Sequence, residues 1–237
     1  MSGNERKVAI VTGGSRGIGA GVAAGYRRQG WAVVANSLRS EPSPDPDVLT
    51  VAGDVAEPAT TDRIIGAALE RFGRIDTLIN NAGLFISKPF TDYTGQDYAS
   101  VVGVNLTGFF RLTQRVIAEM LKQTAGHVVN ITTTLVDYAD SSQPSVLASL
   151  TKGGVAAATR SLAIEYAARG IRVNAVAPGV IQTPMHAAES YEALASRSPM
   201  RRVGQVSDIV DGILFLESSP FITGETLHID GGQIAGH

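Results

Sequence analysis

The sequence predicts a single-domain α/β fold built on a doubly wound parallel sheet. Short apolar runs rich in β-branched residues alternate with helix-length segments, and Gly and Pro residues bound many of them. The chain of 237 residues is long enough for one well-buried domain and too short for two comfortable ones. In a doubly wound sheet, ligands bind beside the carboxyl ends of the strands, so functional residues are expected there.

The apolar runs predict strands at residues 7–12, 31–36, 48–52, 75–79, 127–132, 171–177 and 226–229. Long helices are expected near residues 17–29, 96–124 and 146–169. Alternating prolines in residues 41–47 remove amide donors, so the link between the second and third strands is predicted to be an extended surface connector. A docking motif for a proline-reading partner is the alternative interpretation.

The composition excludes several classes of function. The chain has no cysteine, so disulfides, thiolate metal sites and cysteine nucleophiles are excluded, and no metal site is predicted. A net charge of -2 offers no electrostatic attraction to nucleic acid or to an anionic membrane. No apolar run reaches the ~20 residues that span a bilayer, and polar residues 1–7 lead straight into a strand. We therefore expect a cytoplasmic protein without nucleic-acid or membrane partners.

A glycine-rich turn joins the first predicted strand to the first helix, with the sequence Thr12-Gly13-Gly14-Ser15-Arg16-Gly17-Ile18-Gly19. Glycines let the backbone approach a pyrophosphate closely, and the free N–H groups at a helix amino terminus attract the anion. Glycines also serve plain turns, but the position of this turn favours dinucleotide binding in a Rossmann fold. The predicted cofactor contacts here are Gly13, Ser15, Arg16, Gly17, Ile18 and Gly19.

Several motifs, in order from residue 8 to residue 232, together resemble the short-chain dehydrogenase/reductase family. Residues 12–19 resemble its TGxxxGxG signature, and residues 80–83 its NNAG motif. Asp54-Val55 resembles the pair beside the adenine, and Pro178-Gly179 with Thr183 resembles the loop that closes on the nicotinamide. The resemblance implies cofactor contacts at Asp54, Val55, Asn81, Ala82, Gly83, Lys152, Pro178, Gly179, Ile181 and Thr183.

The end of the second strand bears on which cofactor is bound. A carboxylate there would hydrogen-bond the ribose 2′-hydroxyl of NAD and repel a 2′-phosphate. The strand ends instead in Asn36, Ser37, Leu38 and Arg39, all predicted as cofactor contacts, without a carboxylate. Arg39 and Arg16 can both reach a phosphate by charge-assisted hydrogen bonds, whereas a merely solvated Arg39 is the alternative. NADP(H) is therefore favoured over NAD(H).

The resemblance also implies a catalytic set. In the family, hydride passes between the nicotinamide and a carbonyl carbon; a serine orients the carbonyl, a tyrosine gives it a proton, and a lysine lowers the pKa of that tyrosine. Thr133 aligns with the serine, Lys152 with the lysine and Asn105 with the active-site asparagine. A threonine hydroxyl donates and accepts as a serine does. The position of the YxxxK tyrosine, four residues before the lysine, is Ala148.

Another group must move the proton if the reaction is run. Tyr138, in the loop after Thr133, is the nearest candidate, and an ordinary half-buried loop tyrosine is its alternative reading. His186 and Tyr191 lie on the predicted substrate lid, residues 178–203, and are further candidates if the lid closes over the substrate. A water held by Asn105 and Lys152 is the remaining option.

Two functions follow from these motifs. The first is a short-chain NADP(H)-dependent oxidoreductase that interconverts a small-molecule ketone and secondary alcohol with a non-standard proton donor. The second is a dinucleotide-binding protein without turnover, acting as a sensor or assembly partner. A designed loss of the tyrosine would also give this sequence. The resemblance further implies a homo-oligomer, a tetramer or a dimer, built on the two long helices.

Overall fold

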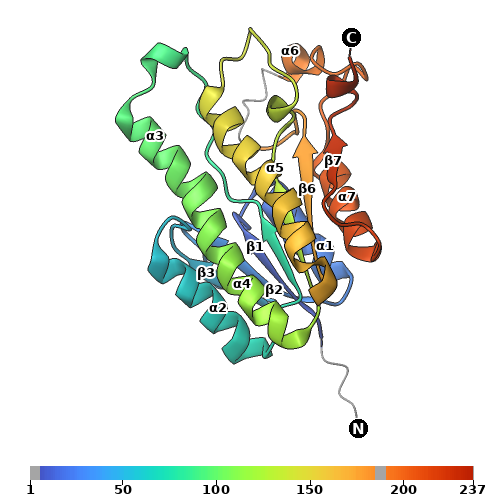
Figure 1. Cartoon of the computed structure of the whole chain (residues 1–237). Coiled ribbons are helices and arrows are strands. Elements are labelled where there is room, and N and C mark those ends of the chain that lie inside the picture. Colours follow the sequence, from blue (N-terminus) through green and yellow to red (C-terminus); the bar gives the residue numbers. More distant parts are fainter. Residues whose placement is uncertain (1–5, 185–190, 237) are drawn as a thin grey trace.

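Seven parallel strands form one sheet in the order β3-β2-β1-β4-β5-β6-β7 within residues 6–184 and 191–236, the part of the chain that the computed structural model describes (Figure 1). The order reverses between β1 and β4, which creates a crevice at the carboxyl edge of the sheet. The predicted doubly wound sheet is confirmed. The strands are β1 Val8–Thr12, β2 Ala32–Ser37, β3 Val48–Ala52, β4 Thr77–Asn80, β5 Gly126–Ile131, β6 Ile171–Pro178 and β7 Thr226–Ile229.

Helices cover both faces of the sheet (Figure 1). The described α-helices are α1 Gly17–Arg28, α2 Pro58–Phe72, α3 Gly95–Val102, α4 Phe109–Gln123, α5 Val146–Tyr166, α6 Tyr191–Ala195 and α7 Val206–Ser218. The helix predicted near residues 96–124 is α3 and α4 joined by a π-helical turn, Gly103–Gly108. Helices α2, α6 and α7 were not assigned from the sequence. Among the described residues, no helix has the length and apolar character needed to cross a membrane.

The link from β2 to β3 contains no helix, as the prolines predicted. Arg27, near the end of α1, holds this connector through ion pairs to Asp45 at 2.9 Å and Asp47 at 3.0 Å. These contacts support the interpretation of residues 41–47 as a surface connector. Because its prolines supply no amide hydrogen for a backbone ladder, the connector is held by these ion pairs together with hydrogen bonds such as that from Thr50 Oγ1 to the Glu41 carbonyl.

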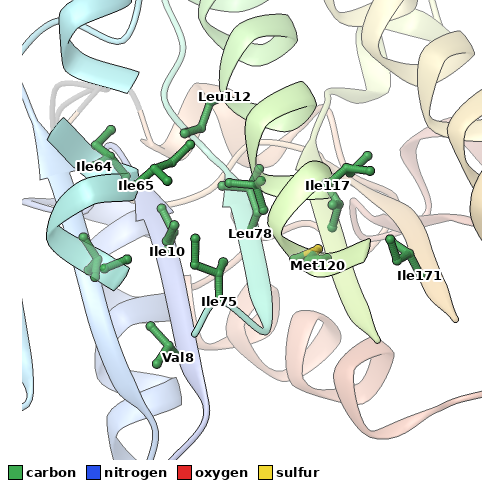
Figure 2. Close-up of a cluster of buried hydrophobic side chains, with 14 of the residues drawn as sticks. Val8, Ile10, Ile64, Ile65, Ile75, Leu78, Leu112, Ile117, Met120 and Ile171 are labelled. Atoms are coloured by element: carbon green, nitrogen blue, oxygen red, sulfur yellow. The ribbon is translucent and has the colours of Figure 1, made fainter. Parts of the chain in front are cut away.

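Two apolar layers fix the helices against the sheet. On one face, Ile64 of α2 and Leu112 and Met120 of α4 pack on Ile10 and Leu78 of the sheet, and these side chains are fully buried or nearly so (Figure 2). On the other face, α1 and α7 bury their own cluster against the same strands. Strands buried on both faces explain why the sequence shows continuous apolar runs rather than alternation.

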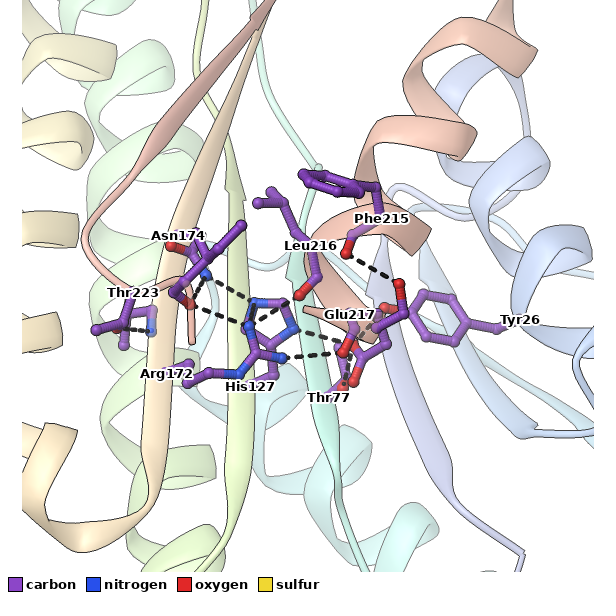
Figure 3. A network of polar contacts seen from close by, with 12 residues as sticks. Tyr26, Thr77, His127, Arg172, Asn174, Phe215, Leu216, Glu217 and Thr223 are labelled. Carbon is purple, nitrogen blue, oxygen red and sulfur yellow. Dashed lines mark hydrogen bonds and ion pairs between the residues drawn. The ribbon is translucent and has the colours of Figure 1, made fainter. Parts of the chain in front are cut away.

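A buried polar network ties five elements together near the amino edge of the sheet (Figure 3). Glu217 at the end of α7 accepts hydrogen bonds from Tyr26 Oη of α1 at 2.8 Å, Thr77 Oγ1 of β4 at 2.9 Å and His127 Nδ1 of β5 at 3.0 Å. Arg172 of β6 donates to the carbonyl oxygens of residues 216, 217 and 222. The network therefore anchors the end of α7 to the strands, and it uses His127 at the edge opposite the expected site.

The partners of His127 decide its charge. Its Nε2 lies 3.1 Å from the amide nitrogen of Asn174 and 3.4 Å from the guanidinium of Arg172, both of which are donors, so Nε2 accepts and Nδ1 carries the proton. Burial lowers the pKa of His127, and the charge of Arg172 lowers it further, against the opposing effect of Glu217. Burial alone would raise the pKa of Glu217, but hydrogen bonds from His127, Tyr26 and Thr77 hold it below its usual value.

This network predicts a loss of stability in mild acid. Because the pKa of His127 is lowered in the folded protein, the unfolded chain binds a proton below pH ~6.5 that the folded chain refuses. As the pH is lowered below ~6.5, the free energy of unfolding should therefore decrease by up to about 1.4 kcal/mol per pH unit. This decrease should stop once the pH reaches the pKa of His127 in the folded protein. Urea midpoints measured from neutral to mildly acidic pH should show this slope in the wild type and a flatter one in His127→Asn. The partly exposed His228 supplies the control His228→Asn; equal slopes for His127→Asn and wild type would contradict the assignment.

Candidate active site

The glycine turn leaves the amino terminus of α1 open. Gly13 and Gly17 adopt φ values of 66° and 54°, in the left-handed region that favours glycine. Arg16 occupies the N-cap in an extended conformation without a side-chain capping bond, and the first turn carries no acidic residue. The first N–H groups of the helix therefore lack a side-chain partner within the described residues, which suits a phosphate group.

Strand β4 holds this turn in place through Thr12. The Thr12 hydroxyl accepts hydrogen bonds from the backbone N–H groups of Asn81 and Ala82, each at 3.0 Å. The Asn81 amide in turn donates to the carbonyl oxygens of Thr12 at 2.9 Å and Gly13 at 3.3 Å. A Cβ built on Gly19 would lie 2.2 Å from the Gly13 carbonyl oxygen, so helix and turn are packed backbone to backbone. The two glycine-containing motifs thus form one rigid unit.

The end of β2 mixes buried and exposed groups. Asn36 is buried, and its amide nitrogen donates to the carbonyl oxygens of Val51 and Gly53, each at 3.0 Å, so this nitrogen joins β2 to β3. The Ser37 hydroxyl donates to the Arg39 carbonyl at 2.7 Å. Leu38 is 69% exposed, and Arg39 is also exposed. Among these four predicted contacts, Leu38 and Arg39 therefore present their side chains most fully to an incoming ligand.

The turn after β3 lies against the π-helical turn. The Asp54 carboxylate accepts from the backbone N–H of Ala56 at 2.9 Å, which shapes the turn. Val55 is buried, and a Cβ built on Gly108 would lie 2.9 Å from its carbonyl oxygen. The predicted adenine-side pair is therefore fixed by close packing against the element that carries Asn105.

The carboxyl edge brings Gly83, Asn105 and Lys152 together. A Cβ built on Gly83 would lie 3.3 Å from Lys152 Nζ and 3.5 Å from Asn105 Oδ1. Asn105 accepts from the backbone N–H of Leu84 at 2.8 Å, and its amide donates to the Leu84 carbonyl and to Thr151 Oγ1. Because both ends of its amide are occupied, Asn105 positions the segment after β4 against α5.

Lys152 has an environment suited to proton chemistry. Its ammonium donates to the carbonyl oxygen of Ile131 at 2.6 Å, and burial lowers its pKa to about 8. The residue as a whole is only half-buried, so the lowered pKa belongs to the enclosed end of the side chain. A cavity of about 10 Å³ adjoins it, lined also by Asn80, Asn105 and Val155. That volume matches roughly one water molecule.

Burial distinguishes the three threonines that follow β5. The Thr132 hydroxyl is buried and donates to the Val176 carbonyl at 3.1 Å. Thr134 is buried beside Gln233, with 3.5 Å between Oγ1 and Oε1. Thr133 is partly exposed, and its hydroxyl accepts from the backbone N–H of Leu135 at 3.3 Å. Of these three threonines, Thr133 is therefore the one that is not buried.

The candidates for the proton donor lie in different places. Ala148 is buried in the first turn of α5. Tyr138 is partly buried, and its backbone N–H donates to the Thr134 carbonyl at 2.9 Å. The Tyr191 hydroxyl donates to the Thr183 carbonyl at 3.1 Å. His186 lies outside the described residues.

The chain leaving β6 returns over the glycine turn. The backbone N–H of Gly179 donates to the Ile229 carbonyl at 3.0 Å, and a Cβ there would lie 2.8 Å from the Asp230 Cα. Ile181 is buried and bridges to Gly204. A Cβ built on Gly17 would meet the Thr183 side chain at 3.4 Å. Residues 178–183, which follow β6 in the chain, thus approach the first glycine motif in space.

A second, larger cavity lies next to β7. It measures about 460 Å³ and lies between the segment after β6 and β7, with Leu194, Arg197, Met200 and Ile229 in its wall. His228 also lines it and pairs with Asp137, 3.0 Å between Nε2 and Oδ2. The sequence around His228 gives no sign that its side chain lines a cavity, because a single histidine in a short strand belongs to no recognisable motif. Within the described residues, no cluster of three His, Cys, Asp or Glu side chains could hold a metal ion.

Known proteins resemble this chain over nearly its whole length. Residues 13–233 match the family model described as "Enoyl-(Acyl carrier protein) reductase". The 3-oxoacyl-[acyl-carrier-protein] reductase of Synechocystis sp. is 36% identical, covering 96% of this chain and 97% of its own. The Thermotoga maritima reductase of the same name is 35% identical, covering 97% and 98%.

Solved structures agree with the sequence relatives. ElxO with NADP bound superposes with a TM-score of 0.91 at 31% identity, covering 98% of this chain and 100% of that one. The 3-ketoacyl-(acyl-carrier-protein) reductase from Brucella melitensis complexed with NADH gives a TM-score of 0.89 at 29% identity, covering 97% and 99%.

The chain belongs to the short-chain dehydrogenase/reductase family. Within that family it is an NAD(P)-dependent oxidoreductase with a Rossmann-like fold. The similar proteins are reductases by name or carry a nicotinamide cofactor, which favours an enzyme over a binding protein without turnover.

Close backbone packing at the glycine turn yields a stability prediction. Gly19→Ala would place a methyl group 2.2 Å from the Gly13 carbonyl oxygen, so the backbone must shift. We expect a loss of about 1–3 kcal/mol in the free energy of unfolding, measured by urea denaturation. Gly66→Ala in α2 is the matched control, since nothing lies within 4 Å of its Cβ position. It should stabilise the protein by up to about 1 kcal/mol; an equal gain at Gly19 would contradict the packing argument.

Proposed function

We propose that the protein is an NADP(H)-dependent oxidoreductase that interconverts a ketone and a secondary alcohol. One observation carries the proposal: Lys152, Asn105 and Gly83 converge beside an uncapped helix terminus at the carboxyl edge of the sheet. The open N–H groups of α1 fit a pyrophosphate, and the glycine turn leaves room for it. The relatives' printed substrate, a 3-oxoacyl group on a carrier protein, is the first substrate class to test.

The bound cofactor would supply or accept the hydride. In this proposal the α1 terminus binds the pyrophosphate, Arg16 and Arg39 bind the 2′-phosphate, and Thr183 closes over the nicotinamide end. Thr133 hydrogen-bonds the substrate oxygen through its accessible hydroxyl. Lys152 holds a positive charge next to the site where negative charge develops on that oxygen, and its lowered pKa of about 8 eases proton release.

The proton donor differs from the one usual in the family, because Ala148 carries no ionisable group. We propose Tyr138, which follows Thr133 in the loop beside the site and is partly buried. The cavity of about 10 Å³ beside Lys152 and Asn105 favours a second route, in which a water in that cavity gives the proton. Residues 178–203 act in this proposal as the substrate lid.

The surface of the two long helices supports a homo-oligomer. Phe110 of α4 is 61% exposed, and Leu150 and Ile164 of α5 are 55% and 79% exposed. Burying such apolar side chains against a second copy is favourable. We propose a dimer or tetramer built on these helices, and a monomeric mass in analytical ultracentrifugation would contradict it.

Cofactor titration tests the proposed function directly. Ligands that bind the folded state raise the thermal midpoint in proportion to the logarithm of concentration over Kd. We expect NADPH to raise it at lower concentrations than NADH. Trp31 is buried at the amino end of β2, away from the site, so the midpoint is a better readout than its fluorescence. Tighter binding of NADH would contradict the cofactor preference, and no shift with either would contradict the function.

The proposed proton donor is tested by removing the phenolic hydroxyl of Tyr138. Tyr138→Phe should lower the rate of ketone reduction by about 10²–10⁴-fold, the usual contribution of a positioned acid, with NADPH affinity unchanged. Tyr98→Phe, at an exposed position of α3, is the matched control. Ala148→Tyr should raise the rate by placing a phenol one helical turn from Lys152. An unchanged rate in Tyr138→Phe would exclude Tyr138 and leave the water route.

A further inference from the structure

Arg63 of α2 carries a positive charge that no carboxylate neutralises within the described residues. Its Nη2 donates to the Ala52 carbonyl at 3.0 Å and to Thr60 Oγ1 at 3.1 Å, which are neutral acceptors. The adjacent acid, Asp62, pairs instead with Arg115 at 2.7 Å. The charge of Arg63 is therefore available to act on an anion that binds nearby.

Gly53 provides the seat for this guanidinium. Gly53 has a φ of 147°, and a Cβ built on it would lie 2.4 Å from Arg63 Nη2 and 2.5 Å from Thr60 Oγ1. Any side chain at position 53 would displace the arginine from the turn after β3. The guanidinium of Arg63 thus occupies the space that a side chain at position 53 would fill.

The same turn is bonded to the end of β2. The Gly53 N–H donates to the Ser37 carbonyl at 2.9 Å, and the Asn36 amide donates to the Gly53 carbonyl at 3.0 Å. Arg63 and the strand end that the proposed function assigns to the 2′-phosphate therefore lie against the same residue, Gly53. Arg63 approaches from the β3 side, whereas Arg39 follows β2 in the chain.

A second observation at this strand end points to a ligand. The Ser40 hydroxyl is the buried side-chain atom without a hydrogen-bond partner among the described residues. The next residue, Glu41, accepts from Thr50 Oγ1 at 3.0 Å, so the segment carrying Ser40 runs back beside β3. Native proteins rarely leave such a hydroxyl unpaired, and a bound anion would supply the acceptor it lacks.

We propose that Arg63, with Ser40, forms a β3-side wall of the 2′-phosphate site and sets the preference for NADP(H). The proposal rests on the proposed function and adds to it a residue on a different element from Arg16 and Arg39. The guanidinium acts through space on the doubly charged phosphate, whereas NADH carries only a neutral hydroxyl at that position. Its effect is therefore specific to NADPH and weakens with salt.

The experiment compares equilibrium affinities for NADPH and NADH by calorimetry, at low and at high salt. Arg63→Gln keeps a donor for the Ala52 carbonyl and removes the charge, so it should raise the Kd for NADPH by about three- to tenfold at low salt. The Kd for NADH should not change, and Arg63→Lys should retain most of the affinity. Ser40→Ala should weaken NADPH binding and leave NADH binding as it is.

Arg115→Gln is the matched control, since it removes the same charge from an exposed arginine on α4. It should leave both affinities unchanged. Equal weakening of NADPH and NADH by Arg63→Gln would show that the residue only holds β3 to α2, and no weakening of either would also overturn the proposal. A wild type that does not prefer NADPH would overturn the proposed cofactor preference itself. By contrast, a wild type that prefers NADPH and an Arg63→Gln variant that keeps the same preference would overturn only the role of Arg63.

Discussion

The hydroxyl of Thr12 carries the constraint on which the carboxyl edge of the sheet depends. It accepts two backbone N–H groups from the segment after β4, while that segment's Asn81 amide donates back to the turn after β1. Gly14 is tied in addition to the Asn36 carbonyl at 2.8 Å, which brings β2 into the same unit. The direction of α1, the position of Gly83 beside Lys152 and the approach of Thr183 all follow from this fixed junction.

The two edges of the sheet differ in how far their polar groups are satisfied. At the amino edge, Glu217, His127 and Arg172 satisfy one another and nearby carbonyl groups. At the carboxyl edge, the α1 terminus has no capping side chain, the pKa of Lys152 is lowered to about 8 and Ser40 has an unpaired hydroxyl. Under the proposed function, stability and ligand binding belong to opposite ends of the same strands, and the open end keeps groups that an entirely structural protein would pair.

The fold was predictable where its signals are local. Short apolar runs mark the strands, and the glycine turn and residues 80–83 are contiguous in sequence, so their chemistry can be inferred from the sequence alone. Helices α2 and α7 were not assigned, because Gly66, Gly212 and β-branched residues lower their intrinsic helix propensity, although both helices bury apolar residues at helical spacing. The choice among Thr132, Thr133 and Thr134 required burial, which depends on β6 and on Gln233, far along the chain. The seat of Arg63 on Gly53 likewise exists only in three dimensions.

The π-helical turn between α3 and α4 inserts one extra residue into what is otherwise a single long helix. At 3.6 residues per turn, one residue rotates everything beyond it by about 100°. This offset lets Asn105 face Thr151 while Leu112 and Met120, further along, still face the sheet. In a regular α-helix, Asn105 and Leu112 are seven residues apart and would point in nearly the same direction, so they could not face Thr151 and the sheet respectively. The π-helical turn thus changes the direction in which side chains point, so that one long helix can present Asn105 to α5 and still pack its apolar side chains on the sheet.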